Sequence, residues 1–536
     1  MKHPSSTGRQ GKFAQVPRAE IPRSQFDRSH ALKTTFDAGK LVPIFIDEAL
    51  PGDTFNLRLN AFARLGTPLK PLMDNIWLDT FFFAVPYRLI WRNWEKFNGA
   101  QEDPGDSTDY TIPKTTVPAA GYNVGSFEDY CGLPTGVAPG SPAWTHSALP
   151  RRAYFRIYNE WFRDENILNS LNWNNDDGPD VSASGGEALR LRGKRHDYFT
   201  SCLPWPQKGT AVSLPLGTSA PVVSEGDGIP TFQNAIGPGF TLGAKTAAVE
   251  PDVKLVDAGG SSAWTLEEGI EWLDPKLEAD LSTATAATIN ALRQAFQIQK
   301  LLERDARGGT RYTEIVKSHF GVTSPDARLQ RTEYLGGGSA PVIVSPIAQN
   351  SANTSEPTPQ GNLAGIGTVS VSGHGFVKSF TEHCILLGLA SARADLTYYQ
   401  GVERFWSRST RYDFYWPALA QIGEQAVLNQ EIYLQGSSDD AAAFGYQERY
   451  AEYRYKPSRI TGLFRPGVSG TLDIWHCAQE FGALPTLNAA FIEEAPPIDR
   501  VIAVPAEPHF FMDCWFDLKC ARPMPMFGVP GFIDHF

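Results

Sequence analysis

The chain has 536 residues, of which 42% are hydrophobic, 12% aromatic and 20% charged, and its formal net charge is −11. This composition excludes a globally disordered protein, and the length exceeds that of a usual single domain. The sequence has no apolar run of about 18 residues and no apolar stretch after its first basic residues. We therefore expect neither a membrane span nor a signal peptide.

Charge is distributed unevenly along the chain. Residues 1–40 carry eight basic and three acidic side chains, so the rest of the chain is strongly acidic. The first 18 residues contain four basic residues, no acid and few apolar anchors, which predicts an extended arm. A basic arm on an acidic body suits an anionic polymer, although an ordinary solvated terminus would look similar. The candidate nucleic-acid-binding residues are Lys2, Arg9, Lys12, Arg18, Arg23 and Arg28.

Several segments have the pattern of β-strands. Residues 55–61 and 510–520 alternate between apolar and polar positions, which predicts strands with one buried face. Residues 76–85 are almost continuously apolar, which predicts a strand buried on both faces. Further strands are expected at residues 369–389, as one long or two short strands with a bulge or bend at Gly373 and Gly375, and at residues 471–476.

Helices and long connections interrupt this pattern. Apolar spacing predicts helices at residues 154–161 and 282–304. Residues 99–150 hold seven Gly and seven Pro, too many for regular structure. Residues 209–281 hold eleven acidic and three basic side chains and read as a surface excursion. Short strands joined by such excursions fit a mainly β protein, but the pattern alone does not separate a sandwich from a barrel.

Two aromatic groups are interpreted as core or intersubunit anchors rather than as ligand sites. One is the helical stripe of Trp91, Trp94 and Phe97, and the other is the Tyr-Trp-Pro turn at residues 415–417.

The sequence offers little for catalysis or metal binding. It has no GxSxG, HExxH or GxxxxGK[ST] motif. The six cysteines form no CxxC pair, so we expect reduced, mostly buried thiols. The neighbours His383 and Cys384, and likewise His476 and Cys477, would point to opposite faces of a strand, which disfavours a shared metal ion. We therefore expect no enzyme activity, no metal and no cofactor.

Six segments, in order along the chain, resemble the major capsid proteins of gokushoviruses, the single-stranded DNA phages of the Microviridae. The most specific is ARGGTRYTEIVKSHFGVTSPDARLQRTEYLGGG at residues 306–338. Thr332 departs from the family pattern, which usually has proline before Glu-Tyr-Leu-Gly-Gly, and it therefore frees a backbone N–H. The other segments are residues 23–55, 63–75, 81–97, 192–209 and 522–536.

This resemblance implies an eight-stranded antiparallel jelly-roll barrel with long loop insertions and a few helices. It implies a subunit of a sixty-copy (T=1) icosahedral capsid that encloses a single-stranded DNA genome. The protein would be synthesised and assembled in the host bacterial cytoplasm and reside in the virion. Its implied partners are further copies of itself, internal scaffolding and DNA pilot proteins, and a host surface receptor.

The alternative to a capsid subunit is a non-capsid phage protein that binds a receptor or a carbohydrate through residues 209–281.

The resemblance also divides the chain into regions. The expected regions are a basic interior arm (1–40), the first part of the jelly roll (41–208, with the excursion 99–150), an acidic insertion that forms threefold protrusions and attaches to the host (209–281), and a helix with the rest of the jelly roll and a docked C-terminus (282–536).

Overall fold

The computed structural model describes residues 22–140, 143–210, 212, 289–309, 312–322, 330–351 and 360–527, and short strands between residues 222 and 279. The chain divides into two compact units, of which the second spans Gln207–Gly308 and the first contains the rest. The expected arm residues Lys2, Arg9, Lys12 and Arg18, and the expected C-terminal docking segment at 531–536, lie outside the described residues.

The larger sheet of the first unit is antiparallel and six-stranded, and it joins the two ends of the chain. Its last strand in sequence, β19, pairs with β4 on one edge and with β1 and β2 on the other. The strands are β1 (Ser24–Asp27), β2 (His30–Phe36), β19 (Phe510–Arg522), β4 (Thr54–Leu65), β15 (Leu363–Ser379) and β14 (Ile343–Ala348).

The smaller sheet is antiparallel and four-stranded. Its strand order is β13 (Glu333–Pro341), β5 (Ile76–Pro86), β16 (Cys384–Ala394) and β3 (Val42–Ala49).

The chain passes repeatedly from one sheet to the other. Strands β2, β4, β15 and β19 belong to the larger sheet, and β3, β5, β13 and β16 to the smaller one. Eight strands in two antiparallel sheets of this kind fit the expected jelly roll, with β14 as an additional strand that forms a hairpin with β15. The mainly β class predicted from the sequence is confirmed.

The main hydrophobic core lies between the two sheets. Strand β4 contributes Phe55, Leu57 and Leu59, all fully buried, while Arg58 and Asn60 on its opposite face are exposed. Strand β5 contributes Leu78 and Phe82 from the facing sheet. Burying these apolar faces against each other supplies most of the driving force for this architecture.

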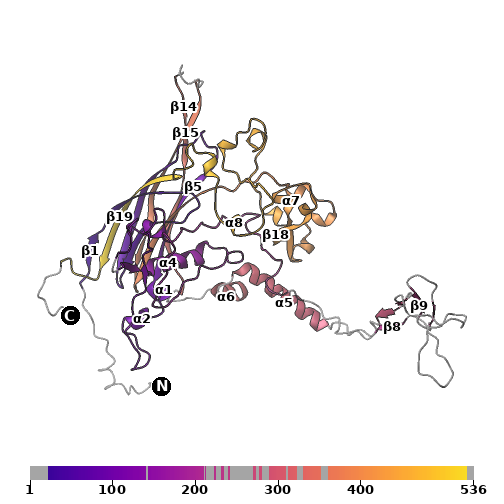
Figure 1. The fold of residues 1–536 in the computed structure, drawn as a ribbon, viewed down its shortest axis with the longest axis horizontal. Coiled ribbons are helices and arrows are strands. Elements are labelled where there is room, and N and C mark those ends of the chain that lie inside the picture. Colours follow the sequence, from indigo (N-terminus) through magenta and orange to yellow (C-terminus); the bar gives the residue numbers. More distant parts are fainter. Residues whose placement is uncertain are drawn as a thin grey trace, which may run out of the picture. The chain divides into compact units, whose positions relative to one another are not determined.

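The outer face of the smaller sheet is also covered. A second cluster joins Phe83 and Val85 of β5 to Leu387 and Leu389 of β16 and to the helices that follow β5. The sequence therefore correctly predicted that the strand at residues 76–85 is buried on both faces. The covering elements are α1 (Tyr87–Ile90), α2 (Trp94–Phe97), α4 (Leu149–Ile157) and a π-helical turn, η2 (Tyr158–Phe162); Figure 1 shows α1, α2 and α4 beside the strands.

A long excursion between β16 and β19 builds a separate lobe of the first unit. Together with residues 198–202 it forms a separate apolar cluster, which includes Tyr198, Tyr398 and Phe444. Figure 1 shows α7 and β18 of this lobe on the right of the first unit, away from β1 and β19. Its regular elements are β17 (Glu424–Leu428), α7 (Asn429–Ile432), β18 (Ala443–Glu448) and α8 (Ala489–Ile492), and its 3-10 turns are η3 (Arg404–Trp406), η4 (Arg411–Asp413), η5 (Pro417–Leu419), η6 (Ser438–Ala441), η7 (Ala451–Tyr453), η8 (Gly462–Phe464), η9 (Asp473–Trp475) and η10 (Ile498–Arg500).

The remaining elements are short, apart from one helix. In the first unit they are β6 (Lys114–Thr116), α3 (Phe127–Tyr130), β7 (Thr145–Ser147) and α6 (Tyr312–Phe320). The second unit contains β8 (Val222–Ser224), β9 (Thr231–Asn234), β10 (Phe240–Thr241), β11 (Ile270–Trp272), β12 (Leu277–Ala279) and the long helix α5 (Ile289–Gly308).

Two local expectations need correction. Residues 471–476 form no strand, because η9 occupies Asp473–Trp475 and His476 binds the carbonyl of Phe464 through its ring nitrogen. Residues 99–150 are mostly irregular but do contain β6, α3 and β7. By contrast, residues 369–389 fall in two strands, and the expected irregularity is confirmed by a register shift between Ser372 and His374.

A buried ion-pair network links strands β5 and β16 of the smaller sheet to Arg192, which lies in the connection between β5 and β8. Asp79 accepts hydrogen bonds from Arg192 at 2.5 Å, Arg393 at 2.9 Å and Ser339 at 2.5 Å. Burial alone would raise the pKa of Asp79, but the hydrogen bonds from Arg192 and Ser339 and the charge of Arg393 hold that pKa below its usual range. The carboxylate is thus the common partner of two guanidinium groups.

We expect Asp79→Asn to lower the free energy of unfolding by about 3–5 kcal/mol, because Arg393 is buried and would lose its main countercharge. The contribution of the carboxylate is full above its unfolded pKa near 4 and is lost as the pH falls through the lower folded pKa. Urea denaturation of the purified chain at neutral and acidic pH measures both effects. Asp513→Asn, which removes an exposed pair with Lys33, is the control, and an equal loss in the two variants would contradict the prediction.

Candidate assembly and genome-binding surfaces

Of the candidate nucleic-acid-binding residues in the predicted basic arm, the structure describes Arg23 and Arg28. The Arg23 guanidinium donates to Thr54 Oγ1 at 2.9 Å on the surface. Arg28 donates to both carboxylate oxygens of Asp47, at 2.6 and 3.0 Å. Because Asp47 lies in β3, this bidentate pair links the edge of the larger sheet to the smaller sheet. Arg28 therefore has a structural role within the fold.

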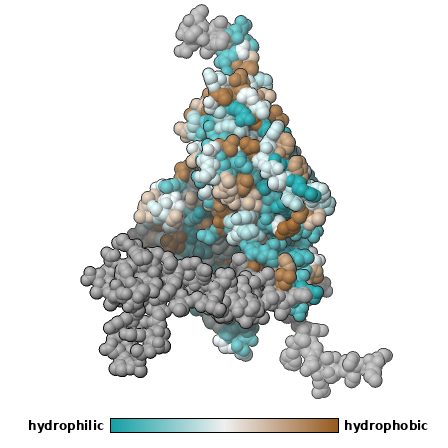
Figure 2. Space-filling view, turned by 90° about the vertical axis from the view of Figure 1, so that its right-hand side faces the viewer, coloured by the Kyte–Doolittle hydropathy of each residue, from teal (hydrophilic) through white to brown (hydrophobic). Residues whose placement is uncertain are grey.

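The lobe between β16 and β19 carries a dense group of exposed aromatic side chains. Each has more than 40% of its surface exposed, which is unusual for large apolar residues outside an interface. We call this group the aromatic surface: Phe405, Trp406, Tyr412, Phe414, Tyr415, Trp416 and Tyr453. Figure 2, seen from the right-hand side of Figure 1, shows hydrophobic patches among hydrophilic residues.

Arginine side chains are interleaved with these rings. Arg408 lies 4.4 Å from the ring centroid of Tyr453 and 5.3 Å from that of Phe414. Arg411 lies 5.1 Å from the ring of Trp416. Such cation–π contacts orient the rings while leaving much of their surface accessible. Aromatic and arginine side chains together are the residue types most enriched in the energetic centres of protein interfaces.

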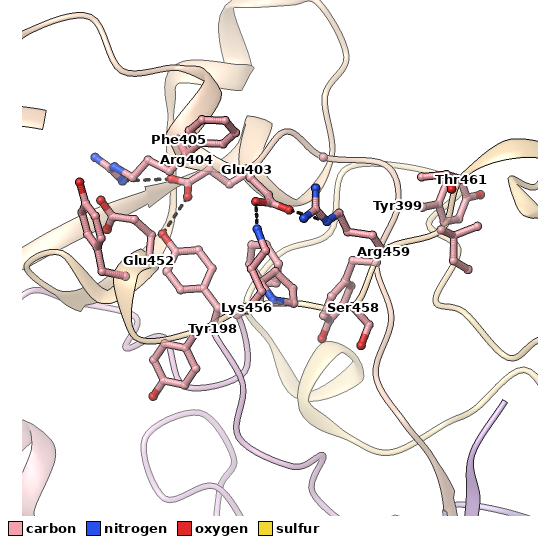
Figure 3. Close-up of a pocket in the computed structure, with 18 of the residues that line it drawn as sticks. Tyr198, Tyr399, Glu403, Arg404, Phe405, Glu452, Lys456, Ser458, Arg459 and Thr461 are labelled. Atoms are coloured by element: carbon pink, nitrogen blue, oxygen red, sulfur yellow. Dashed lines mark hydrogen bonds and ion pairs between the residues drawn. The ribbon is translucent and has the colours of Figure 1, made fainter. Parts of the chain in front are cut away.

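A cavity of about 240 Å³ lies beside the aromatic surface. In Figure 3, Glu403 lies between Lys456 and Arg459, which it contacts at 2.5 and 3.2 Å. Glu431 binds the Tyr198 hydroxyl at 2.7 Å and the Arg404 guanidinium at 3.0 Å. These carboxylates are engaged by cations and a hydroxyl, so the cavity has the character of a structural ion-pair network.

The pKa shifts in this cavity follow from burial. Burial raises the pKa of Glu431, while the backbone N–H of Leu428 and the charge of Arg404 oppose the shift. Burial and the neighbouring Glu431 carboxylate raise the pKa of Tyr198. Burial therefore makes the charged form of each group less favourable than it is in water, and the contact with Arg404 offsets part of this effect for Glu431.

A second exposed apolar surface lies on the β14–β15 hairpin, which projects from the top of the first unit in Figure 1. Ile343, Ile347 and Ile366 are all at least 40% exposed there. Strand β14 is the edge of the larger sheet, and the hairpin therefore presents both side chains and an unpaired strand edge.

The cysteine and metal expectations concern residues that the structure describes. All six cysteines are free, and five of them are buried, as predicted; Cys131 is half-buried. Within the described residues, no group of three or more His, Cys, Asp or Glu side chains is placed to hold a metal ion. In the same part of the chain, no helix is long and apolar enough to span a membrane.

The departure at Thr332 has a local explanation. Its backbone N–H and its hydroxyl both donate to Glu160, at 2.7 and 2.8 Å, and the hydroxyl accepts from Trp161 Nε1 at 2.7 Å. Thr332 is fully buried. A proline would supply neither donor.

Comparison with known proteins agrees with this architecture. The profile of the family described as "Capsid protein (F protein)" matches residues 14–532. The chain belongs to this capsid protein family. It is 49% identical to the capsid protein VP1 of Bdellovibrio phage phiMH2K, with 98% of both chains covered. It is 43% identical to VP1 of Chlamydia phage 1 and 36% identical to VP1 of Spiroplasma virus 4, with 97% of each chain covered. The resemblance inferred from the six segments is confirmed.

The structure also separates the two aromatic groups that the sequence left undecided. Trp91 is fully buried and packs against Trp94 and Phe97, with ring centroids 6.0 and 5.1 Å away, so that stripe belongs to the core. Tyr415 and Trp416 are exposed and belong to the aromatic surface. The rest of that surface was not predicted from the sequence, although six aromatic and three arginine residues between positions 404 and 416 were a usable signal of an interface.

We expect Thr332→Pro to lower the free energy of unfolding by about 2–4 kcal/mol, because half-buried Glu160 would lose two donors and Trp161 its acceptor. Chemical denaturation of the purified chain measures the change. Thr332→Ser keeps the N–H and the hydroxyl and serves as the control. Equal stability of the two variants would show that the hydrogen bonds do not matter.

Proposed function

We propose that this chain is the structural subunit of the capsid of a small single-stranded DNA phage and that it has no enzymatic role. The observation that carries this proposal is the similarity, over nearly the whole chain, to capsid proteins VP1 of phages. The two-sheet β fold with long excursions supplies a rigid wall element whose loops are available for contacts.

The shell contains sixty copies in T=1 icosahedral symmetry and resides in the virion after assembly in the host bacterial cytoplasm. Each subunit contact is repeated by the symmetry, so a closed shell is stable even where a single contact is modest. The aromatic surface and the β14–β15 hairpin are the described regions best suited to such contacts, because both expose apolar side chains that a neighbouring copy would bury.

Genome contact is assigned to the basic arm. Its candidate residues Lys2, Arg9, Lys12 and Arg18 would neutralise phosphates without reading sequence. The acidic stretch at residues 209–281 forms the host-attachment protrusion and contacts the surface receptor. Internal scaffolding and DNA pilot proteins are the further partners during assembly. These assignments rest on the capsid family and on the charge distribution.

The proposed assembly role predicts the effect of truncating the aromatic surface. Wild-type chain co-expressed with its phage partners should form closed shells in negative-stain electron microscopy. The double variant Phe405→Ser with Trp406→Ser should remain folded, because both side chains are more than half exposed, yet lower the particle yield roughly tenfold or more.

Val181→Ser is the matched control, because Val181 is 90% exposed and lies outside the aromatic surface. Normal shells from the double variant would remove the aromatic surface from the assembly contacts. A wild-type chain that stays monomeric with all its partners would overturn the capsid proposal and favour a receptor- or sugar-binding protein.

Deleting residues 1–20 should leave a folded subunit, because β1 begins at Ser24, while particles should contain less DNA. Nuclease-protected DNA per particle is the measurement. A full-length variant with Lys2, Arg9, Lys12 and Arg18 replaced by glutamine tests whether charge rather than length matters. Normal packaging in both variants would contradict the role given to the arm.

A further inference from the structure

The first unit contains a second cavity, of about 430 Å³, whose lining lies outside the aromatic surface. It is bounded on one side by aromatic rings and on another by the basic segment Arg-Gly-Lys-Arg-His at residues 192–196. Its volume lies in the range of small-molecule sites. We refer to it as the basic cavity.

The aromatic wall combines the outer face of β5 with the end of the helical segment that follows α4. Phe83 contacts Trp161 and Tyr334, with ring centroids 5.5 and 5.6 Å away. Trp161 and Tyr334 line the cavity and are themselves 41% and 43% exposed; the Arg331 guanidinium lies 5.6 Å from the ring centroid of Trp161. Phe81 and Phe162 complete the wall. Accessible rings of this kind are platforms for a flat ligand ring.

The basic side of the cavity has more positive than negative charge. Arg163, Lys194 and Arg195 line it together with Arg192, whose guanidinium is bound to Asp79. The single carboxylate of the lining, Asp164, already accepts the backbone N–H groups of Asn166 and Ile167. The lining therefore holds four basic side chains, Arg163, Arg192, Lys194 and Arg195, against the one carboxylate of Asp164.

Burial, the largest cause, and the guanidinium groups of Arg393 and Arg192 lower the pKa of Arg195, while the carboxylates of Asp79 and Asp395 oppose the shift. Burial also lowers the pKa of Lys194, whose ammonium lies 4.8 Å from the ring of Phe491 and 3.3 Å from Gln479. An anion in the cavity would relieve this repulsion.

The backbone keeps the basic segment close to the aromatic wall. A Cβ atom on Gly193 would lie only 2.8 Å from the carbonyl oxygen of Phe162, so a larger residue would force the two segments apart. Gly193 also forms an antiparallel bridge with Glu493, and Lys194 N–H donates to the carbonyl of Ile492 at 2.8 Å. The segment is thus fixed on both sides.

We propose that the basic cavity binds a nucleoside phosphate, with the base on Trp161 and Tyr334 and the phosphate at Arg195. A guanidinium group suits a phosphate because it donates two parallel hydrogen bonds. The accessible rings suit a base of any identity, because stacking does not read sequence. The ligand is either a free nucleotide or one nucleotide of a single strand, since both present the same chemistry.

The test uses the purified full-length chain and isothermal titration calorimetry. The probes are thymidine 5′-monophosphate, thymidine, inorganic phosphate and a short oligothymidylate. Thymidine 5′-monophosphate should bind about tenfold or more tightly than either thymidine or phosphate alone, because only the nucleotide uses both sides of the cavity. If oligothymidylate binds as tightly as the mononucleotide, the natural ligand is one nucleotide of a single strand. If oligothymidylate does not bind, the natural ligand is a free nucleotide.

Two variants separate the two halves of the site. Arg195→Gln should weaken the nucleotide and phosphate roughly tenfold and leave thymidine unchanged. Tyr334→Leu should weaken the nucleotide and thymidine roughly tenfold and leave phosphate unchanged. Arg454→Gln and Phe320→Leu, both exposed and outside the cavity and the aromatic surface, are the matched controls.

The inference is overturned if the wild-type chain binds neither nucleotide nor oligonucleotide, or if both cavity variants bind like the controls. Particle formation is measured separately on the same variants. Because the cavity lies outside the aromatic surface, normal shells without nucleotide binding would reject this site and leave the capsid proposal intact. If the chain binds nucleotide but never assembles, the capsid proposal is rejected and the nucleotide site is retained.

Discussion

The pairing of the last long strand with the first ones is the constraint on which the rest of the structure depends. Strand β19 pairs with β4 from Phe510 to Ala521, and its other edge is occupied by β1 and β2. This interior strand of the larger sheet therefore comes from the C-terminal part of the chain, while its neighbours come from the first 65 residues. The sheet is complete only after almost the whole chain has been made, and such non-local pairing carries a large loop-closure cost.

That cost is offset by burial between the sheets. The apolar faces of β4 and β19 meet those of β5 and β16 in one continuous core. The Asp79 network and the pair of Arg28 with Asp47 add specific links in places where the chain passes between sheets or segments. Charged contacts of this kind fix one arrangement of the strands more than they add net stability.

Because the main core lies between the two sheets, parts of the long connections are available for recognition. The excursion after β16 folds around its own small apolar cluster and presents the aromatic surface. The connection between β5 and β8 supplies Trp161 and the basic residues of the second cavity. Rigid strands therefore position loops whose side chains make the contacts, an arrangement that is common in β proteins.

The sequence by itself determined the class of fold, the family and the strands with a clear period of two. It determined these because alternation at residues 55–61 and 510–520 reports directly which side of a strand is buried. It failed at residues 471–476, where hydrogen bonds to distant backbone groups decide the conformation. It could not place Arg28 in an ion pair with Asp47, or distinguish buried Trp91 from exposed Trp416, since exposure depends on which segments pack together. Only the tertiary structure brought residues 161, 195 and 334 to one cavity, because nothing in local sequence encodes contacts between segments so far apart.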